Sequence, residues 1–239
     1  MKNEFEQILY KKASEAKYEL SDDILNKLWI YKEKLIEWNE KINLTTITDD
    51  EGIIEKHFID SLQCCRYINS KQTVADIGTG AGFPGLVIGI YMPDVKVTLI
   101  DALNKRINFL NDVIDKLNLK NVITIHARAE DLANDIKYRQ KYDIAVARAV
   151  ASTNILLEYT TPYVKVNGKC LLMKSNNIKE EIDRSKNAIN KLNCKISNIY
   201  EYQLNSTEIF NRIIIEVTKL NNTPINYPRS FAKIKKLPL

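Results

Sequence analysis

VADIGTGAGFPG, residues 74–85, joins a short apolar run to a turn that contains four glycines. The apolar run is typical of a buried strand, and residues 86–90, LVIGI, are typical of the buried start of a helix. Glycine is needed where the backbone turns sharply or lies directly against a ligand, because a Cβ atom would clash there. The free N–H groups at a helix start then face that ligand. The stretch predicts a strand, a ligand-binding glycine turn and a helix, although a purely structural turn would also satisfy it.

The glycine spacing separates this turn from two common nucleotide-binding motifs. A dinucleotide site has G-x-G-x-x-G, whereas the order here is G-x-G-x-G-x-x-G with Asp76 two residues ahead, and a P-loop motif is absent from the sequence. The next apolar run ends in Asp101, where a doubly wound fold places its ribose-binding carboxylate. Asp-x-Gly-x-Gly-x-Gly followed by a second acid resembles the S-adenosylmethionine-dependent methyltransferases of the Rossmann-like class. This resemblance implies S-adenosyl-L-methionine as the cofactor.

Composition predicts an ordinary soluble globular protein. The 239 residues are 45% hydrophobic and 27% charged, which allows a substantial core without metal or disulfide support. Because no apolar run has membrane-spanning length and the N-terminus does not resemble a signal peptide, we expect a cytoplasmic protein that does not bind a membrane. No cysteine has C-x-x-C spacing or a nearby histidine, so we expect no metal site and reduced core thiols. The cysteines are Cys64, Cys65, Cys170 and Cys194.

The basic residues near the C-terminus indicate a polyanionic partner. The formal net charge is +5, and residues 221–239 supply +4 of it, with no acid among them. The four cations are Arg229, Lys233, Lys235 and Lys236. A short basic arm on a nearly neutral body suits RNA, while a merely solvated tail is the alternative that charge alone leaves open.

Residues 1–70 show helical periodicity and predict an N-terminal cap of three helices. The first carries apolar residues at spacings of three and four between Phe5 and Ala16. The second begins at Ser21, with two acids in its first turn. Thr48 and Glu51 fit a capping box before the third helix, which runs through Cys65. These amphipathic helices need an α/β body to pack against.

Strands and helices alternate from Thr73 onward, which predicts a parallel sheet with right-handed crossovers. The expected strands are 73–77, 96–101, 122–127, 142–147 and 169–174. The expected helices are 83–91, 104–118, 130–139, 153–164 and 177–192. Two further runs, 194–204 and 212–218, predict an antiparallel hairpin at the sheet edge. We expect one α/β domain over 1–239, formed by the cap at 1–70, a mostly parallel Rossmann-like core at 71–220 and a basic tail at 221–239.

The carboxyl ends of four predicted strands mark the expected site, because ligands of open parallel sheets bind there. These ends are residues 78–83, 101–102, 126–130 and 148–149. Glu130 could be only the favourable first-turn acid of its helix. Arg148 ends an apolar strand, where a charge needs a partner.

Several motifs in the right order resemble one family, the bacterial 16S ribosomal RNA guanine-N7 methyltransferases, also called glucose-inhibited division protein B. They are INLT at 42–45, KHFIDSL at 56–62, VADIGTGAGFPG at 74–85, ARAED at 127–131, VARAVA at 146–151 and the YPR…KKLPL ending. The resemblance covers nearly the whole chain. It implies a fold of the class I methyltransferase type and a 16S rRNA or small-subunit partner. The tail departs from the family, because residues 230–234 lack its Pro-Gly turn.

The resemblance also assigns roles to particular residues. Gly78, Gly80 and Phe83 in the glycine turn are expected to contact S-adenosylmethionine. Ala129 and Glu130 are expected at its adenosine end and Arg148 in the active pocket. The general position of the fold, and not the family motifs, places Asp101 at the ribose. The charge of the tail makes Arg229, Lys235 and Lys236 the expected RNA contacts.

No catalytic base is predicted, because guanine N7 carries a free lone pair and loses no proton before attack. Positioning is then the main task of the enzyme, and an unpaired guanine is the expected substrate, because N7 is hard to reach in A-form RNA. His57 is predicted as a buried structural histidine rather than a substrate contact. Three alternatives stay open: a dinucleotide-dependent oxidoreductase, a small-molecule methyltransferase, and a non-catalytic RNA-binding ribosome-assembly module.

Overall fold

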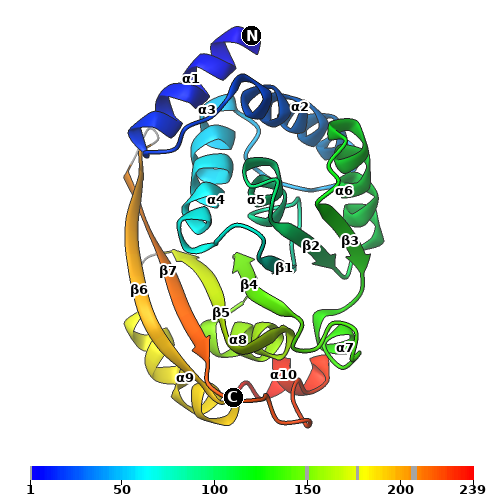
Figure 1. The fold of residues 1–239 in the computed structure, drawn as a ribbon, viewed down its shortest axis with the longest axis vertical. Coiled ribbons are helices and arrows are strands. Elements are labelled where there is room, and N and C mark those ends of the chain that lie inside the picture. The colour runs from blue at the N-terminus through cyan, green and yellow to red at the C-terminus, as the bar shows by residue number, and fades with distance from the viewer. Residues whose placement is uncertain (1, 149–150, 176–177, 206–208) are drawn as a thin grey trace.

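The centre of the molecule is a twisted sheet, seen edge-on through its middle in Figure 1. The structure is a computed structural model that describes residues 2–148, 151–175, 178–205 and 209–239. Within these residues the sheet has seven strands in the order β3-β2-β1-β4-β5-β7-β6. The strands are β1 (Thr73–Ile77), β2 (Lys96–Asp101), β3 (Val122–His126), β4 (Tyr142–Arg148), β5 (Val164–Ser175), β6 (Cys194–Asn205) and β7 (Ile209–Lys219).

Strands β1 to β5 pair in parallel, and β7 pairs antiparallel with both β5 and β6. This confirms the predicted parallel sheet with an antiparallel edge hairpin. Strand β1 lies between β2 and β4, so the chain leaves it toward one side first and returns on the other. The carboxyl ends of these strands therefore form the switch point at which α/β sheets bind ligands.

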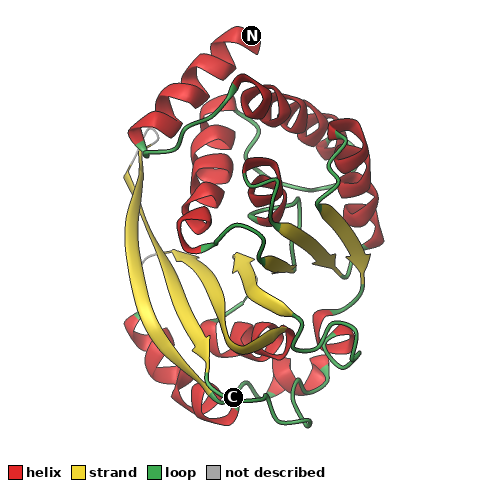
Figure 2. Ribbon diagram, viewed as in Figure 1, coloured by secondary structure: helices red, strands yellow, loops and turns green. Residues whose placement is uncertain are grey.

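Helices cover both faces of the sheet (Figures 1 and 2). The face that carries the chain's N-terminal helices is covered by α1 (Lys2–Glu15), α2 (Asp22–Asn39), α3 (Asp50–Gly52), α4 (Asp60–Leu62), α5 (Gly85–Tyr91) and α6 (Asn104–Leu117), with the π-helix η1 (Ile53–Ile59) and the 3-10 turn η2 (Gln63–Tyr67). The others are α7 (Ala129–Leu132), α8 (Thr153–Thr160), α9 (Lys179–Lys191) and α10 (Phe231–Lys236), with the 3-10 turn η3 (Thr161–Tyr163). No helix among the described residues is long and apolar enough to cross a membrane.

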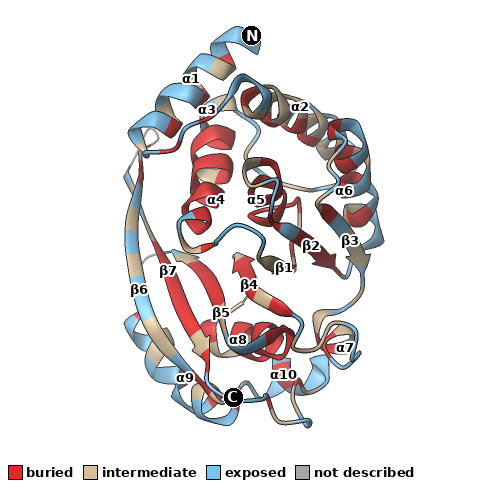
Figure 3. Cartoon of the chain, in the orientation of Figure 1, coloured by how far each residue is buried: buried red, intermediate tan, exposed pale blue. Residues whose placement is uncertain are grey.

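Each face of the sheet has its own apolar core, because successive side chains of a strand point to opposite faces. On β4, Ile144 and Val146 pack in the core formed with α1, α2, α5 and α6. Ala145 and Ala147 pack in the core formed with α8, α9 and α10. Figure 3 shows that the central strands are buried on both faces, as expected for a parallel sheet covered by helices.

The helical cap forms part of the first core. Helix α2 starts after Ser21, whose hydroxyl accepts a hydrogen bond from Ile24 N, as predicted. Tyr31, fully buried on α2, donates a hydrogen bond to the carbonyl of Ala81 in the glycine turn. Trp38 Nε1 donates to Asp112 on α6 at 2.8 Å. These bonds fix the cap to the elements that surround the sheet end.

The third helix of the cap differs from the prediction. Its N-cap is Asp49, whose Oδ1 accepts from Gly52 N at 2.7 Å, and not Thr48. The segment predicted as one α-helix is short α-helical turns on either side of the seven-residue π-helix η1. Such π-helical turns are rare and frequently lie at functional sites.

The helix predicted at 130–139 is also wrong in length, because α7 ends at Leu132. Two side chains compete with the helical hydrogen bonds that would continue it. Asn134 Nδ2 donates to the carbonyl of Glu130 at 2.9 Å, and Asp135 Oδ1 accepts from Lys137 N at 2.9 Å. Asn and Asp favour turns through such local bonds.

The C-terminal segment packs on the second core instead of extending from it as an arm. Ile234 on α10 is fully buried there, and α10 contacts α8. Arg139 holds the preceding loop by donating to the carbonyls of Thr223, Pro224 and Tyr227. Charged side chains of the segment stay at the surface, because Lys233, Lys235 and Lys236 are exposed.

Candidate functional site

The glycine turn follows β1 in a conformation that few other residues adopt. Gly78, Gly80 and Gly82 all have positive φ, at 70°, 61° and 98°. The fully buried carboxylate of Asp76 stabilises the turn through two hydrogen bonds. Its Oδ2 accepts from Thr79 Oγ1 at 2.6 Å and from Gly85 N at 2.8 Å. Burial raises the pKa of Asp76 to about 6. The acid that precedes the turn therefore has a structural role.

Asp101 joins the end of β2 to the glycine turn. Its Oδ2 accepts a hydrogen bond from Gly80 N at 2.9 Å and forms an ion pair with Arg106 Nη1 at 3.3 Å. Its Oδ1 accepts from Leu103 N at 2.9 Å. The carboxylate is buried, so these bonds fix its position at the strand end.

A cavity of about 490 Å³ lies at these strand ends, as the open-sheet rule predicts. Five of the predicted site residues line it together: Gly78, Gly80, Phe83, Asp101 and Arg148. The wall also contains Leu44, Thr45, His57 and Arg106. None of these four was predicted as a site residue. INLT at 42–45 and KHFIDSL at 56–62 supported the family resemblance, and these motifs were the available signal for three of them.

Phe83 is the centre of a stacked group beside this cavity. The ring of His57 lies parallel to it with centroids 4.4 Å apart, and Tyr31 stacks on it at 5.3 Å. The guanidinium of Arg148 lies 4.9 Å from the Phe83 centroid. Stacking and cation–π contacts of this kind fix ring and guanidinium planes. One wall of the cavity is therefore a rigid aromatic and cationic surface.

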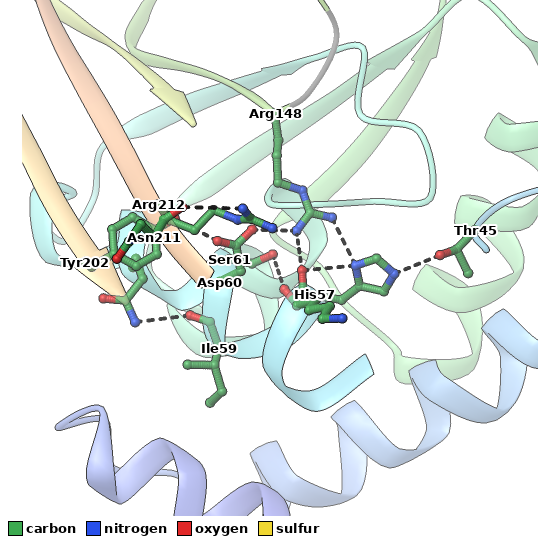
Figure 4. Close-up of polar contacts among 11 residues, drawn as sticks. Thr45, His57, Ile59, Asp60, Ser61, Arg148, Tyr202, Asn211 and Arg212 are labelled. Atoms are coloured by element: carbon green, nitrogen blue, oxygen red, sulfur yellow. Dashed lines mark hydrogen bonds and ion pairs between the residues drawn. The ribbon is translucent and has the colours of Figure 1, made fainter. Parts of the chain in front are cut away.

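Arg148 has the partner that a charge at a strand end needs. Its Nη1 donates to Asp60 Oδ2 at 2.8 Å (Figure 4) and to the carbonyl of Lys56 at 3.0 Å. Asp60 is buried, and its other oxygen accepts from Tyr202 on β6 at 2.7 Å. The ion pair thus links β4, the π-helical segment and the edge hairpin.

His57 is buried and neutral. One ring nitrogen lies 2.9 Å from Thr45 Oγ1, and the other lies 3.4 Å from Arg148 Nη2. Burial, and after it the Arg148 charge, lowers the pKa of His57 to about 3. The structure agrees with the prediction of a buried histidine, while the ring also forms part of the cavity wall.

Ala129 and Glu130 lie beyond the neighbouring strand end and do not line this cavity. The chain reaches them directly after β3, where Ala127 N donates to the carbonyl of Asp101. The Ala129 carbonyl accepts from Tyr163 Oη at 2.7 Å. The Glu130 side chain is buried, and burial raises its pKa. Its Oε1 has no hydrogen-bond partner within the described part of the chain.

The three residues predicted to contact RNA lie in different settings. Arg229 forms an ion pair with Glu158, a fully buried acid on α8, from Nη2 to Oε2 at 2.7 Å. Lys235 and Lys236 are exposed on α10. None of the three lines the cavity at the strand ends.

Two other features of the described residues lie outside the predicted site. No group of three or more His, Cys, Asp or Glu side chains among the described residues could hold a metal ion. A larger cavity of about 650 Å³ lies at the opposite sheet edge, where strands β1, β2 and β4 begin at Thr73, Lys96 and Tyr142. It contains none of the predicted site residues.

Comparison with known proteins connects this geometry to a family. Residues 24–210 match the family described as rRNA small subunit methyltransferase G, or GidB. The chain belongs to the rRNA small subunit methyltransferase G family. Ribosomal RNA small subunit methyltransferase G of Clostridium perfringens (strain 13 / Type A) is 50% identical over 97% of this chain and 98% of its own. The protein of that name from Acetivibrio thermocellus is 48% identical over 97% of this chain and 96% of its own.

Solved structures share the fold at low sequence identity. TYW2 of M. jannaschii, solved in complex with AdoMet, matches with a TM-score of 0.54 and 18% identity over 67% of this chain and 75% of that one. The YcgJ protein of Bacillus subtilis matches with a TM-score of 0.53 and 14% identity over 70% of this chain and 100% of that one. Both matches show that this member of the rRNA small subunit methyltransferase G family has a Rossmann-like fold.

Proposed function

We propose that this protein transfers a methyl group from S-adenosylmethionine to N7 of one guanine in 16S ribosomal RNA. The observation that carries the proposal is the cavity at the switch point, lined by the glycine turn, Asp101 and Arg148, in a chain that belongs to an rRNA methyltransferase family. The proposal includes the small ribosomal subunit or its RNA as partner and the cytoplasm as location.

The residues at the cavity fit an adenosine cofactor. A Cβ atom added to Gly80 would have only the Gly78 carbonyl within reach, at 4.0 Å, so the turn is open on its cavity side. Asp101 lies at the end of the second strand, where a ribose-binding acid is expected. The buried Oε1 of Glu130 lies 4.0 Å from Arg128 Nη1 but accepts no hydrogen bond from the described residues, so it is an acceptor available to a ligand donor. In the proposal, Gly78, Gly80, Phe83, Asp101, Ala129, Glu130 and Arg148 hold the cofactor.

The protein's part in the reaction is positioning. The bound cofactor supplies an electrophilic methyl group on a sulfonium. The rigid wall of His57, Phe83 and Arg148 holds the reacting groups in line, and such alignment is worth ~7–11 kcal/mol. His57 stays neutral at working pH, because its pKa is about 3. The N7 lone pair needs no base, and none is assigned.

The test is methyl transfer to RNA followed by mapping of the base. Purified protein, tritium-labelled S-adenosylmethionine and 16S rRNA, either free or in small subunits from a strain lacking this gene, should give labelled RNA. Cleavage of the labelled RNA at 7-methylguanosine by borohydride and aniline should locate a single methylated guanine. RNA with 7-deazaguanine at that position is the matched control, because it lacks N7.

Each rival function gives a different result. Label on the RNA at an atom other than N7 would survive the 7-deazaguanine control and contradict the assignment. A small-molecule methyltransferase would leave both RNA forms unlabelled. A non-catalytic assembly module would bind RNA without binding S-adenosylmethionine in calorimetry.

A further inference from the structure

A second cavity adjoins the first across the side chains of His57 and Arg148, which line both. Its volume is about 320 Å³. It lies between the π-helix η1 and the ends of β5 and β7, and Figure 4 shows Arg148, Asp60 and Arg212 of its wall close to one another. No residue in its wall apart from Arg148 belongs to the predicted site.

The wall of this cavity is basic. Four cationic side chains line it, and two acids, Asp60 and Glu181, face them. Both acids are already paired: Asp60 with Arg148 at 2.8 Å, and Glu181 with Lys174 at 2.8 Å. The remaining two cations are Lys56 and Arg212. Neither forms an ion pair with a carboxylate in the part of the chain that the structure describes, so both are available to an anion.

Phe210 holds these two cations in place. Lys56 Nζ lies 4.3 Å from the centroid of the Phe210 ring, and the Arg212 guanidinium lies 5.6 Å from it. A cation over an aromatic face is attracted to it, yet it keeps its charge and its hydrogen-bond donors. The arrangement therefore positions two charges without neutralising them.

The elements that carry the two cations are fixed to each other. Pairing of β7 with β5 ends at Arg212, so Ile209 to Asn211 pair only with β6 and extend beyond β5. Tyr202 on β6 binds Asp60, directly after the π-helix that carries Lys56. The Lys56 carbonyl in turn accepts from Arg148. The cavity is thus built by the same contacts that position Arg148.

We propose that this second cavity receives the target guanosine of the RNA, with Lys56 and Arg212 bound to its flanking phosphates and Phe210 as their positioning residue. The inference rests on the proposed function and adds the place of the substrate. Cofactor and nucleotide then lie on opposite sides of His57 and Arg148. An anionic, unpaired nucleotide matches the free positive charge, and single-stranded RNA binds through such contacts.

The test removes both free charges and compares the result with an equal loss elsewhere. The variant is Lys56→Gln with Arg212→Gln. The control is Lys96→Gln with Lys120→Gln, two exposed lysines at the opposite sheet edge that line the larger cavity. The probe is an unmethylated single-stranded 16S rRNA fragment that contains the target guanine. Its affinity for each protein variant is measured as a function of salt concentration.

Two lost phosphate contacts should lower the salt slope by about 1.4 units, at ~0.7 per contact on single strands. If the affinities converge at 1 M salt, this corresponds to about a 25-fold loss at 0.1 M. The control should keep the wild-type slope, and S-adenosylmethionine affinity should be unchanged in both. Phe210→Leu, which keeps both charges, should weaken RNA binding by about two- to fivefold.

Equal slopes for the cavity variant and the wild type would overturn the proposal, and so would an equal loss in the control. A folded cavity variant is recognised by its unchanged S-adenosylmethionine affinity. Failure of the proposed function is a separate result, because the wild-type protein would then leave small-subunit RNA unmethylated. If the wild type methylates the RNA and the cavity variant equals it, only the substrate position is wrong.

Discussion

Arg148 and Asp60, which are 88 positions apart in the sequence, form a 2.8 Å ion pair between the end of β4 and the helical cap. Both side chains are largely buried, with exposed fractions of 15% and 5%. The pair ties the cavity wall to a distant segment, so a change in either residue should affect both the fold and the site.

A single variant and a double variant separate these two effects. Arg148→Ala should lower the free energy of unfolding by ~3–5 kcal/mol, because it leaves the buried Asp60 carboxylate without its charge partner. Adding Asp60→Asn should restore part of this loss, since the uncompensated charge is then gone. Methylation should stay low in both variants. Denaturant unfolding and tritium transfer measure the two quantities, and full methylation by the folded double variant would refute a role of Arg148 in the site.

The C-terminal segment offers a second buried pair. Arg229 donates from Nε and Nη2 to both oxygens of the fully buried Glu158. Arg229→Ala should therefore cost ~3–5 kcal/mol in unfolding free energy. Lys236→Ala on the same segment should change it by no more than about 0.5 kcal/mol, because that lysine is exposed. An unchanged free energy of unfolding in Arg229→Ala would show that this ion pair does not stabilise the folded protein.

Gly80 and Gly82 should respond differently to a single methyl group. Gly80→Ala points into open space, so stability should fall by only about 1 kcal/mol for the positive φ, while S-adenosylmethionine affinity should fall by tenfold or more. At Gly82 a Cβ would lie 2.6 Å from Tyr31 Oη and 2.9 Å from Leu110 Cδ2. Gly82→Ala should lower stability by ~3 kcal/mol or more. Calorimetry and chemical unfolding test both, and normal cofactor affinity in Gly80→Ala would contradict the assignment of the glycine turn to S-adenosylmethionine binding.

His57 predicts a pH dependence of stability. Its pKa is lowered from 6.5 to about 3 in the folded protein, so between these values the unfolded chain binds the proton that the folded protein refuses. Stability should therefore fall as pH drops through this window, by about 1.4 kcal/mol per pH unit. Asp76 acts in the opposite direction below pH 6, because burial raises its pKa.

The His57→Gln variant isolates the histidine contribution, since Asp76 is present in both proteins. Its stability should depend less on pH between 4 and 6.5 than that of the wild type. His126→Gln is the matched control, because His126 is exposed and is the only other histidine in the sequence. Parallel stability curves for wild type and His57→Gln would contradict the lowered pKa.

Glu130 should matter to the cofactor more than to the fold. Burial raises its pKa, which means that the ionised side chain destabilises the folded state above that pKa. Glu130→Gln should therefore keep or raise stability, while loss of a charged hydrogen bond worth ~1.5–3 kcal/mol lowers S-adenosylmethionine affinity tenfold to hundredfold. Unchanged affinity would mean that Glu130 serves only the start of α7.

The sheet was predictable because its central strands are buried on both faces and therefore read as continuous apolar runs. β1 and β2 match the predicted ranges, 73–77 and 96–101, residue for residue. β5 begins at Val164, before the predicted 169. Residues 165–167, KVN, are exposed, and only Val164 is buried in this part of the strand. An exposed strand beginning gives no apolar signal.

The contacts that complete the site were not predictable from local sequence. The π-helix η1 has the same apolar spacing as an α-helix over a few residues, so periodicity did not reveal it. Asp60, Tyr202 and Arg148 meet only through the tertiary fold. Glu158 lies in the apolar helix TNILLEYT, and nothing beside it in the sequence indicates an arginine 71 positions away.

The bond from Tyr31 to the Ala81 carbonyl limits how this enzyme can be recombined. Tyr31 belongs to the cap, whereas Ala81 and Phe83, on which its ring stacks, belong to the glycine turn. A chimera that joins this cap to the α/β body of a distant methyltransferase would place an unmatched phenol against a foreign turn. Cap and body are therefore not interchangeable modules. A change at Tyr31 in the cap requires a matching change in the glycine turn of the body.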